Sequence, residues 1–330
     1  MNDLRLGTRG SQLALWQANA VAARIAAIGG PPCRIVVIKT SGDRLQEAPL
    51  SEAGGKRLFV KEIEDALLRG EIDLAVHSSK DMPAALPESL VIAGTLPRDN
   101  PLDAVVLPVA AGGSGLMTIE DLVAVLGQTP GIGTSSVRRV AQLTRLFPNA
   151  RFEPIRGNLD TRLRKLDEGQ YNAIVLAAAG LRRLGFDGRI SMALPAAVCV
   201  PAPGQGIVAI EIRADDDTVR YAVSQINDPQ AAAALDAERA VVEALGGGCQ
   251  TPIGALATPR PGKTSETSET SGSIEAMELD LVACVVSLDG SRAVRGHARG
   301  PMQQARQLGV EVARQLLSEG AAGILEQHRN

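Results

Sequence analysis

The stretch IDLAVHSSKDMP, residues 72–83, decides the fold class of this chain. Its mostly apolar first part predicts a buried strand with both faces covered. A polar cluster follows at once. Ligands of open α/β sheets bind beyond the carboxyl ends of the strands, so this cluster is a candidate site. Asp81 lies in it next to Lys80, whose charge favours the ionised carboxylate. The alternative is a solvated loop before Pro83, and we interpret His77 as a structural histidine rather than a base.

Strands and helices alternate on both sides of this stretch. The patterns predict strands at 4–6, 35–38 and 72–76, with helices at 11–28 and 60–69. The alternation then restarts near residue 100, with strands at 105–107, 131–133 and 173–176 and helices at 122–126, 136–147, 158–168 and 180–184. Thr118 and Asp121 form a weak capping box before the first of these helices. This order predicts two similar α/β units with mostly parallel sheets.

The last third of the chain has a different pattern. An apolar strand is predicted at 207–212, followed by a helix at 231–245, a strand at 277–286 and a helix at 303–317. These elements indicate a separate small α+β domain, although the strand at 207–212 could return to the first unit. Residues 258–275 carry Thr-Ser-Glu repeats and few apolar side chains. We expect them to form a mobile surface insertion.

Composition excludes several classes of function. Aromatic residues make up only 2% of the 330 residues and the net charge is −3, which argues against a nucleic-acid partner. The four cysteines form no CxxC pair and the three histidines are scattered, so we expect no metal site. No apolar run approaches the ~20 residues of a membrane span, and we find no secretory signal. We expect a cytoplasmic protein.

A second candidate site follows the strand predicted at 131–133. Three hydroxyl residues open the next helix, and two arginines stand in its first turn: Thr134, Ser135, Ser136, Arg138 and Arg139. Free N–H groups at a helix start attract anions. Arginines in a first turn oppose the helix dipole, so we expect a bound anion to compensate them. The segment only half-matches a dinucleotide fingerprint, because Ser136 stands where the third glycine belongs.

Cations continue to gather after this turn. Between Arg138 and Lys165 there are seven Arg and one Lys against two acidic residues. Arg156, Asn158 and Arg162 bracket another helix start, and Arg183 adds to the same half. Charge runs are usually solvated faces, but these recur at strand-to-helix turns. We therefore expect a small polyanionic ligand.

Cys249 follows three glycines at 246–248. Glycines let the backbone approach closely and leave the thiol accessible, so a covalent attachment point is one interpretation. A plain helix end with an inert cysteine is the other.

Together these pieces resemble the porphobilinogen deaminase family. The matching segments are residues 7–18, 54–62, 76–83, 133–139, 156–162, 177–185, 203–206 and 238–254. The chain departs from the family pattern at Arg57 and in the insertion at 258–275. The resemblance implies two lobes like those of type II periplasmic binding proteins and a small α+β domain. We expect domain 1 at 1–100 plus about 200–216, domain 2 at 101–199 and domain 3 at 217–330.

The resemblance also implies the chemistry. A dipyrromethane cofactor would be attached to Cys249 as a thioether, and four porphobilinogen molecules would be joined with loss of ammonia before hydrolysis releases hydroxymethylbilane. Asp81 would be catalytic. The implied cofactor ligands are Ser78, Ser79, Lys80, Asp81, Thr134, Ser135, Ser136, Arg138 and Arg139. The implied substrate ligands are Arg9, Ser11, Phe59, Arg156, Asn158, Arg162, Arg183 and Gln205. Residues 42–55 would form a lid, and the enzyme would be a monomer.

Two rival functions remain at this point. A solute-binding protein of the same two-lobed architecture needs an anion site but neither the chemistry of Asp81 nor Cys249. A dinucleotide-dependent enzyme is disfavoured by the incomplete glycine fingerprint.

Overall fold

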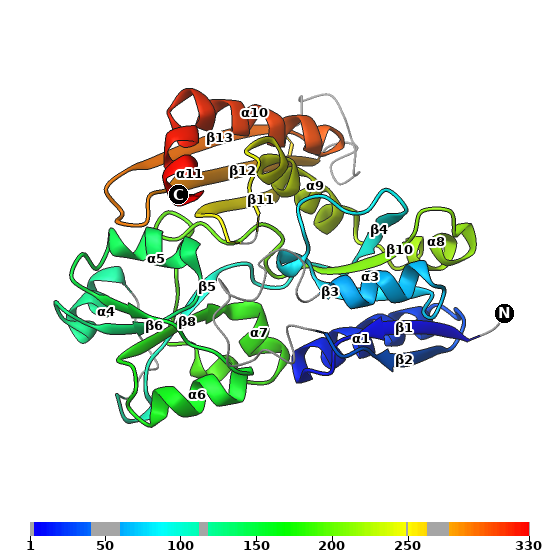
Figure 1. The fold of residues 1–330 in the computed structure, drawn as a ribbon, viewed down its shortest axis with the longest axis horizontal. Helices are drawn as coiled ribbons and strands as arrows, with labels where there is room; N and C mark the ends of the chain where they lie inside the picture. Colours follow the sequence, from blue (N-terminus) through cyan, green and yellow to red (C-terminus); the bar gives the residue numbers. More distant parts are fainter. Residues whose placement is uncertain (1–2, 41–59, 112–117, 249, 263–276, 330) are drawn as a thin grey trace.

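The chain folds into two α/β lobes and a third domain that lies over both of them (Figure 1). The computed structural model describes residues 3–40, 60–111, 118–248, 250–262 and 277–329. The expected lid at 42–55 lies outside these ranges. None of the helices within them is long and apolar enough to cross a membrane.

The first lobe is built on a five-stranded sheet. Its strands are β1 (Leu4–Thr8), β2 (Cys33–Val37), β3 (Leu74–Ser78), β4 (Leu90–Thr95) and β10 (Val208–Arg213), in the order β2-β1-β3-β10-β4. β1 pairs in parallel with β2 and β3, whereas β10 runs antiparallel to β3 and β4. Helix α1 (Gln12–Ala27) packs on one face of the sheet and α3 (Lys61–Leu68) on the other.

Helix α8 (Asp217–Ser224) also belongs to this lobe. Its residues Val219 and Val223 lie in the same buried cluster as Leu74 and Ile210 of the sheet. The expected boundary of the third domain at residue 217 is therefore wrong. The amphipathic pattern of a helix shows that it has a buried face but not which sheet covers that face.

The second lobe repeats the strand order of the first. Its strands are β5 (Asp103–Val106), β6 (Gly131–Gly133), β7 (Arg151–Glu153), β8 (Ala173–Ala177) and β9 (Met192–Ala193), in the order β7-β6-β8-β5-β9. Its helices are α4 (Ile119–Leu126), α5 (Val137–Thr144), α6 (Leu159–Asp167) and α7 (Ala178–Arg183). The capping box predicted for Thr118 and Asp121 is confirmed at the start of α4.

The two lobes are joined by two crossings of the chain. The first, at 96–102, leads from β4 into β5, and the second, at 194–207, leads from β9 into β10. Each crossing delivers the strand that runs antiparallel in the sheet it enters. The two-lobed α/β fold predicted from the sequence is confirmed.

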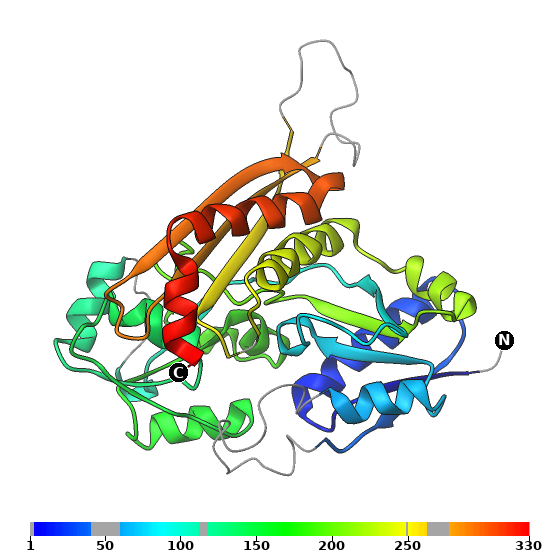
Figure 2. The ribbon, with the colours of Figure 1, turned by 45° about the horizontal axis from the view of Figure 1, so that its top comes forward.

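The third domain is an antiparallel sheet covered by helices. It contains α9 (Pro229–Ala244), β11 (Ile253–Pro261), β12 (Met277–Val286), β13 (Ala293–Pro301), α10 (Ala305–Ser318) and α11 (Ala321–Arg329). Figure 2 shows α9 and α10 side by side against the strands. Their close approach requires Gly309, because a Cβ there would stand 2.2 Å from the carbonyl oxygen of Ala237. This small α+β domain agrees with the prediction.

The expected insertion at 258–275 is wrong at its start. β11 continues to Pro261, where it pairs with Met277 of β12. β11 is an edge strand of its sheet, and such strands tolerate proline, so the polar composition of 258–261 did not show the backbone pairing. Residues 263–276 lie outside the described part of the chain.

A buried ion pair fastens the third domain to both crossings. Glu238 of α9 is fully buried and accepts from Nη1 of Arg98, on the first crossing, at 2.5 Å. Its carboxylate also accepts from the backbone N–H of Gly204, on the second crossing, at 2.6 Å and of Ala257 in β11 at 2.8 Å. One carboxylate therefore contacts three segments far apart in the sequence.

We predict that Glu238→Gln lowers the free energy of unfolding by ~3–5 kcal/mol, because it leaves the Arg98 charge buried without its partner. Urea unfolding followed by circular dichroism measures the change. Glu243→Gln on the same helix is the control. Glu243 pairs with the exposed Arg306 at 2.7 Å, so its loss should cost no more than about 1 kcal/mol. Equal losses in the two variants would contradict the anchoring role of Glu238.

Candidate active site

The turn that follows β3 carries the first group of predicted site residues. It is a short 3-10 helix, Ser79–Asp81, in which Ser79 is buried, Lys80 is half-buried and Asp81 is exposed. The N–H of Ser79 donates to the carbonyl of Ile207 at 3.0 Å, which ties the turn to the second crossing. The backbone thus holds Asp81 at the end of a buried strand, as predicted from the sequence.

Asp81 lines a cavity of about 60 Å³ in the first lobe. Arg9 and Ser11, from the turn between β1 and α1, line the same cavity. Ser11 also caps α1 by accepting a hydrogen bond from the N–H of Ala14 at 3.3 Å. The remaining lining residues are Leu13, Ala14, Gln17, Val60, Val76, His77 and Ser78. Asp81 and two predicted substrate ligands some 70 residues upstream, Arg9 and Ser11, therefore lie around one cavity.

Ser78 and Gln17 form the polar wall of this cavity. Gln17 of α1 is buried, and its Nε2 donates to Oγ of Ser78 at 2.8 Å. The sequence analysis missed Gln17. It lies on the face of α1 that also buries Ala18 and Val21, and a glutamine at a core-facing helix position was the available signal.

In the second lobe, the hydroxyl groups predicted to bind an anion are used within the chain. Ser136 caps α5 by accepting from the N–H of Arg139 at 3.4 Å, and Oγ1 of Thr134 accepts from the N–H of Ser136 at 3.3 Å. Oγ of Ser135 donates to the carbonyl of Ile155 at 2.8 Å. These contacts fix the turn between β6 and α5.

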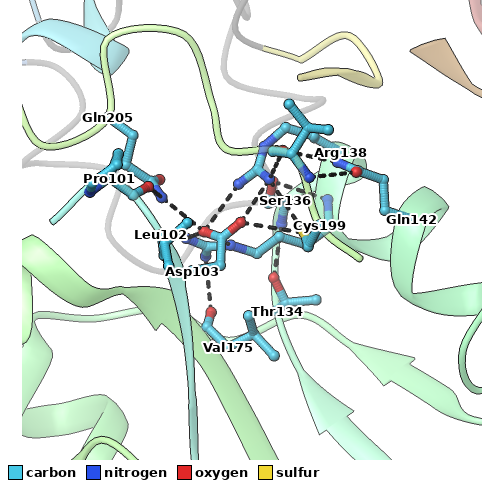
Figure 3. Close-up of polar contacts among 12 residues, drawn as sticks. Pro101, Leu102, Asp103, Thr134, Ser136, Arg138, Gln142, Val175, Cys199 and Gln205 are labelled. Atoms are coloured by element: carbon cyan, nitrogen blue, oxygen red, sulfur yellow. Dashed lines mark hydrogen bonds and ion pairs between the residues drawn. The ribbon is translucent and has the colours of Figure 1, made fainter. Parts of the chain in front are cut away.

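The anion that compensates Arg138 and Arg139 comes from the chain itself. Both arginines are buried, and both pair with the fully buried Asp103 at the start of β5 (Figure 3). Nη1 of Arg138 lies 2.6 Å from Oδ2 of Asp103, and Nη2 of Arg139 lies 2.7 Å from Oδ1. The chain itself therefore supplies a counter-charge for this pair, while the predicted role of both arginines in binding a ligand stays a prediction. Sequence spacing could not reveal a carboxylate that lies 35 residues upstream.

Further donors converge on Asp103. Nε2 of Gln205 donates to Oδ1 at 3.0 Å, and the thiol of Cys199 donates to Oδ2 at 3.3 Å. Burial alone would raise the pKa of Asp103, but the two guanidinium groups outweigh it and hold that pKa well below its usual range. Asp103 was missed in the sequence, although an acidic residue at the head of an apolar run signals a buried charge in need of a partner.

Two other predicted substrate ligands, Gln205 and Arg183, form hydrogen bonds with the crossings. Gln205 is buried, and its Nε2 also donates to the carbonyl of Pro101 at 2.7 Å. Nη2 of Arg183 donates to the carbonyl of Gly206 at 2.6 Å, and its guanidinium lies 5.5 Å from the ring centre of Trp16 in the first lobe. Both residues therefore connect the lobes in this structure.

Lys80 and Arg162 have lowered pKa values because they are buried among like charges. Burial lowers the pKa of Lys80, and the balance of that effect with the attraction of Asp81 and the repulsion of Arg139 brings it to about 8. Burial likewise lowers the pKa of Arg162, with Arg139 and Arg156 acting in the same direction and Asp81 opposing them. One cation of each lobe, Lys80 and Arg162, thus interacts electrostatically with Asp81, and a bound anion would relieve the repulsion among the cations.

Arg156 and Asn158 lie at the start of α6, beside Arg162. Nε of Arg162 donates to the carbonyl of Gly157 at 2.8 Å, whereas Asn158 is exposed and its side chain makes no capping hydrogen bond. The structure therefore brings Arg162 toward Asp81 and leaves Asn158 at the surface. Phe59 and Cys249 lie outside the described residues.

Three of the four cysteines are poor nucleophiles. Burial raises the pKa of Cys33, that of Cys199 to about 12 and that of Cys284 to about 11. Because the thiolate is the reactive form, these thiols stay protonated and inert near neutral pH. Within the described residues, no group of three or more His, Cys, Asp or Glu is arranged to hold a metal ion.

Two family models match the chain. One, described as porphobilinogen deaminase, dipyromethane cofactor binding domain, matches residues 4–221. The other, described as porphobilinogen deaminase, C-terminal domain, matches residues 232–318. The first match ends within α8, in agreement with the packing of that helix on the first lobe.

Relatives named porphobilinogen deaminase match over nearly the full length. The protein from Geobacter metallireducens is 42% identical, with 98% of this chain and 94% of the relative covered. The one from Moorella thermoacetica is 44% identical, with 99% and 97% covered. Among solved structures, an ancestral cationic amino acid solute binding protein has a TM-score of 0.40 and 14% identity, covering 68% of this chain and 88% of that one. That likeness is too slight to bear on function.

We predict that Asp103→Asn lowers the free energy of unfolding by ~3–5 kcal/mol at neutral pH, because Arg138 and Arg139 lose their buried counter-charge. The pKa of this carboxylate is lower in the folded than in the unfolded chain. Its contribution to stability is therefore complete at pH values above the unfolded-state pKa and is lost as the pH falls toward the folded-state pKa. The difference in the free energy of unfolding between wild type and variant should therefore become smaller only below about pH 4.

Urea unfolding at a series of pH values tests this. Asp167→Asn in the same lobe is the control, since Asp167 pairs with Arg189 at 2.8 Å where both side chains are partly exposed, and its loss should cost no more than about 1 kcal/mol. An Asp103→Asn variant as stable as the Asp167→Asn control would refute the central role of Asp103.

Proposed function

The chain belongs to the porphobilinogen deaminase family, and we propose below how its own residues carry out that family's reaction. It is a transferase, a hydroxymethylbilane synthase of tetrapyrrole biosynthesis. It condenses four porphobilinogen molecules head to tail with loss of ammonia and releases hydroxymethylbilane by hydrolysis. The observation that supports the residue assignments is the set of repelling cations from both lobes around Asp81.

Asp81 acts on the pyrrole ring of the substrate. Loss of ammonia leaves positive charge spread over the pyrrole nitrogen, and a preorganised carboxylate lowers the energy of that charge. Asp81 lines the cavity at the end of a buried strand, so it needs no rearrangement to meet the ring. Lys80 and Arg162 carry the opposite charge and attract the carboxylate of Asp81.

Cations receive the acetate and propionate groups of the substrate. Arg9 and Ser11 line the cavity beside Asp81, and Arg162 with Arg156 approaches from the second lobe. Guanidinium groups bind carboxylates through two parallel hydrogen bonds, which fixes the orientation of the ring as well as its position. Phe59, Asn158, Arg183 and Gln205 complete the proposed substrate contacts.

The dipyrromethane cofactor of this family supplies the nucleophilic pyrrole ring on which the product is built. The residues present fit such a group. Among the described atoms, Oγ of Ser79, Nε of Arg138 and Oε1 of Gln205 are buried without a partner, which is costly unless a ligand satisfies them. Two of these atoms can donate to a carboxylate and one can accept from a pyrrole N–H.

The full proposed set of cofactor ligands is Ser78, Ser79, Lys80, Asp81, Thr134, Ser135, Ser136, Arg138 and Arg139, with Cys249 as the covalent attachment. The raised pKa values of Cys33, Cys199 and Cys284 support Cys249 as the reactive thiol. We place the enzyme in the cytoplasm as a monomer that acts on a small molecule, without nucleic acid, membrane or obligate protein partner.

The attachment site is tested by mass spectrometry of the purified protein. Peptide mapping should find the dipyrrole adduct on Cys249 and leave Cys33, Cys199 and Cys284 unmodified. Cys249→Ser should have the mass of the bare chain and form no product. An active preparation with an unmodified Cys249 would contradict the assignment. An inactive, unmodified wild-type chain that binds porphobilinogen would favour the alternative, a binding protein without catalysis.

We predict that Asp81→Asn slows single turnover on the order of a hundredfold or more, because removal of a preorganised charge typically costs ~3–4 kcal/mol in the transition state. The measurement uses purified holoenzyme and porphobilinogen. Lys80→Gln is the matched variant from the same turn, and it should raise KM more than it lowers the rate of the chemical step. Turnover of holo Asp81→Asn within about threefold of wild type would exclude the catalytic role.

A further inference from the structure

A buried carboxylate–histidine pair lies behind Asp81 and has no role in the mechanism above. Nε2 of His77, on β3, lies 3.0 Å from Oε2 of Glu211, on β10. His77 is 5% exposed and Glu211 is fully buried. The two strands are adjacent and antiparallel, and Ala209 pairs with His77 while Glu211 pairs with Ala75. The contact therefore joins diagonal neighbours on one face of the sheet.

The cost of this pair argues against a purely structural role. Oε1 of Glu211 is buried and has no partner among the described residues. On the same face of the sheet, Ala75 packs against Ile63 and Leu67 of α3. An apolar pair of similar size would fill this space without desolvating a carboxylate. Functional sites often contain buried charged groups whose desolvation lowers the stability of the fold.

Glu211 can select the tautomer of His77. An ionised carboxylate only accepts hydrogen bonds, so it would pair with the tautomer that carries its proton on Nε2, the nitrogen that faces Oε2. The other ring nitrogen, Nδ1, is then left with a lone pair. It makes no hydrogen bond to another described residue. His77 is also one of the residues that line the same cavity as Asp81.

The reaction needs a proton acceptor besides Asp81. Each condensation forms a carbon–carbon bond between the α-carbon of the accepting pyrrole and the methylene carbon of porphobilinogen. The methylene carbon–nitrogen bond breaks, and ammonia leaves with the electron pair. The accepting α-carbon then loses its hydrogen as a proton, and its bonding electrons restore the aromatic ring. If Asp81 took that proton, it would lose the charge with which it stabilises the pyrrole cation.

We propose that His77 is the general base that removes the α-proton through Nδ1, and that Glu211 is the positioning residue that holds it in the required tautomer. The proton passes from Nδ1 to ammonia or water, which restores neutral His77 for the next condensation. No oxidant or reductant takes part. The proposal deepens the function proposed above and rests on it, because it assigns a second base to the same site.

The tautomer can be measured without turnover. The chain has three histidines, so ¹⁵N NMR of histidine-labelled protein gives few signals, and His77→Asn identifies those of His77. We expect the chemical shift of an unprotonated nitrogen at Nδ1 and of a protonated one at Nε2. In Glu211→Gln this preference should be lost. A doubly protonated ring, or the opposite tautomer in the wild-type protein, would overturn the proposal.

The catalytic role is tested with porphobilinogen carrying deuterium at its unsubstituted α-carbon. Holo His77→Asn should turn over on the order of a hundredfold more slowly than wild type, as is typical of a lost general base. Its primary isotope effect should exceed that of wild type, because proton removal becomes rate-limiting. Glu211→Gln should show the same rise to a smaller extent. A slow variant with an unchanged isotope effect, or turnover within threefold of wild type, would overturn the proposal.

Asp73→Asn is the matched control for damage to the sheet. Asp73 precedes β3 and pairs with Arg5 at 2.6 Å, at the opposite end of the strand from the cavity. This variant should lose stability but keep the wild-type isotope effect. Product formation by the wild-type holoenzyme tests the proposed function separately. A working wild-type enzyme with a normal isotope effect in His77→Asn would therefore refute only the role of His77.

Discussion

The carboxylate of Asp103 is the contact on which the arrangement of the lobes depends. It stands where the first crossing enters the second lobe, and it binds two arginines of α5 together with Gln205 of the second crossing. Two buried guanidinium groups side by side would repel each other strongly in an environment of low dielectric constant. Their attraction to the carboxylate of Asp103 outweighs that repulsion, and the shared contact joins α5 to both crossings. Glu238 links the third domain to the same crossings, so two buried acids organise three domains.

This organisation explains how the site can lie between lobes without losing its geometry. The N–H of Ser79 donates to the carbonyl of Ile207, and Arg183 donates to the carbonyl of Gly206. Both lobes therefore form hydrogen bonds with the same short segment of the second crossing. Gly206 has a φ of +87°, and a Cβ there would stand 2.4 Å from the carbonyl oxygen of Asp99. The crossings therefore pack backbone against backbone. The positions of Ser79 and Arg183 therefore depend on this contact between the crossings.

The sequence predicted what depends on local chemistry and missed what depends on distant partners. The helix α1, the capping box at Thr118 and the strand β12 all follow from short-range patterns and agree with the structure. β13 was missed because small residues occupy its inward positions. A Cβ on Gly296 would approach Val312 of α10 to 3.0 Å, so close packing of the helix removed the apolar alternation that identifies a strand. The packing of α8 on the first lobe and the pairing of Arg138 with Asp103 were missed because both depend on contacts between residues far apart in the sequence. For the site, the pattern predicted Asp81 at the end of a strand, but it could not distinguish arginines paired inside the protein from those left for a ligand.

The direction of the pKa shifts makes that distinction. Burial alone would lower the pKa of Arg138, yet the pKa is raised, because Asp103 compensates the charge. Arg162 and Lys80 are half-buried, and the nearby carboxylates do not outweigh their loss of hydration, so their pKa values are lowered. In the proposed function, a ligand that brings carboxylates gains most where the cations are least compensated, which favours Lys80 and Arg162 as its contacts. Because Asp103 neutralises them, Arg138 and Arg139 can be buried in the folded protein before any ligand binds. Folding and substrate recognition thus use the same residue type, and the presence or absence of a buried acid separates the two roles.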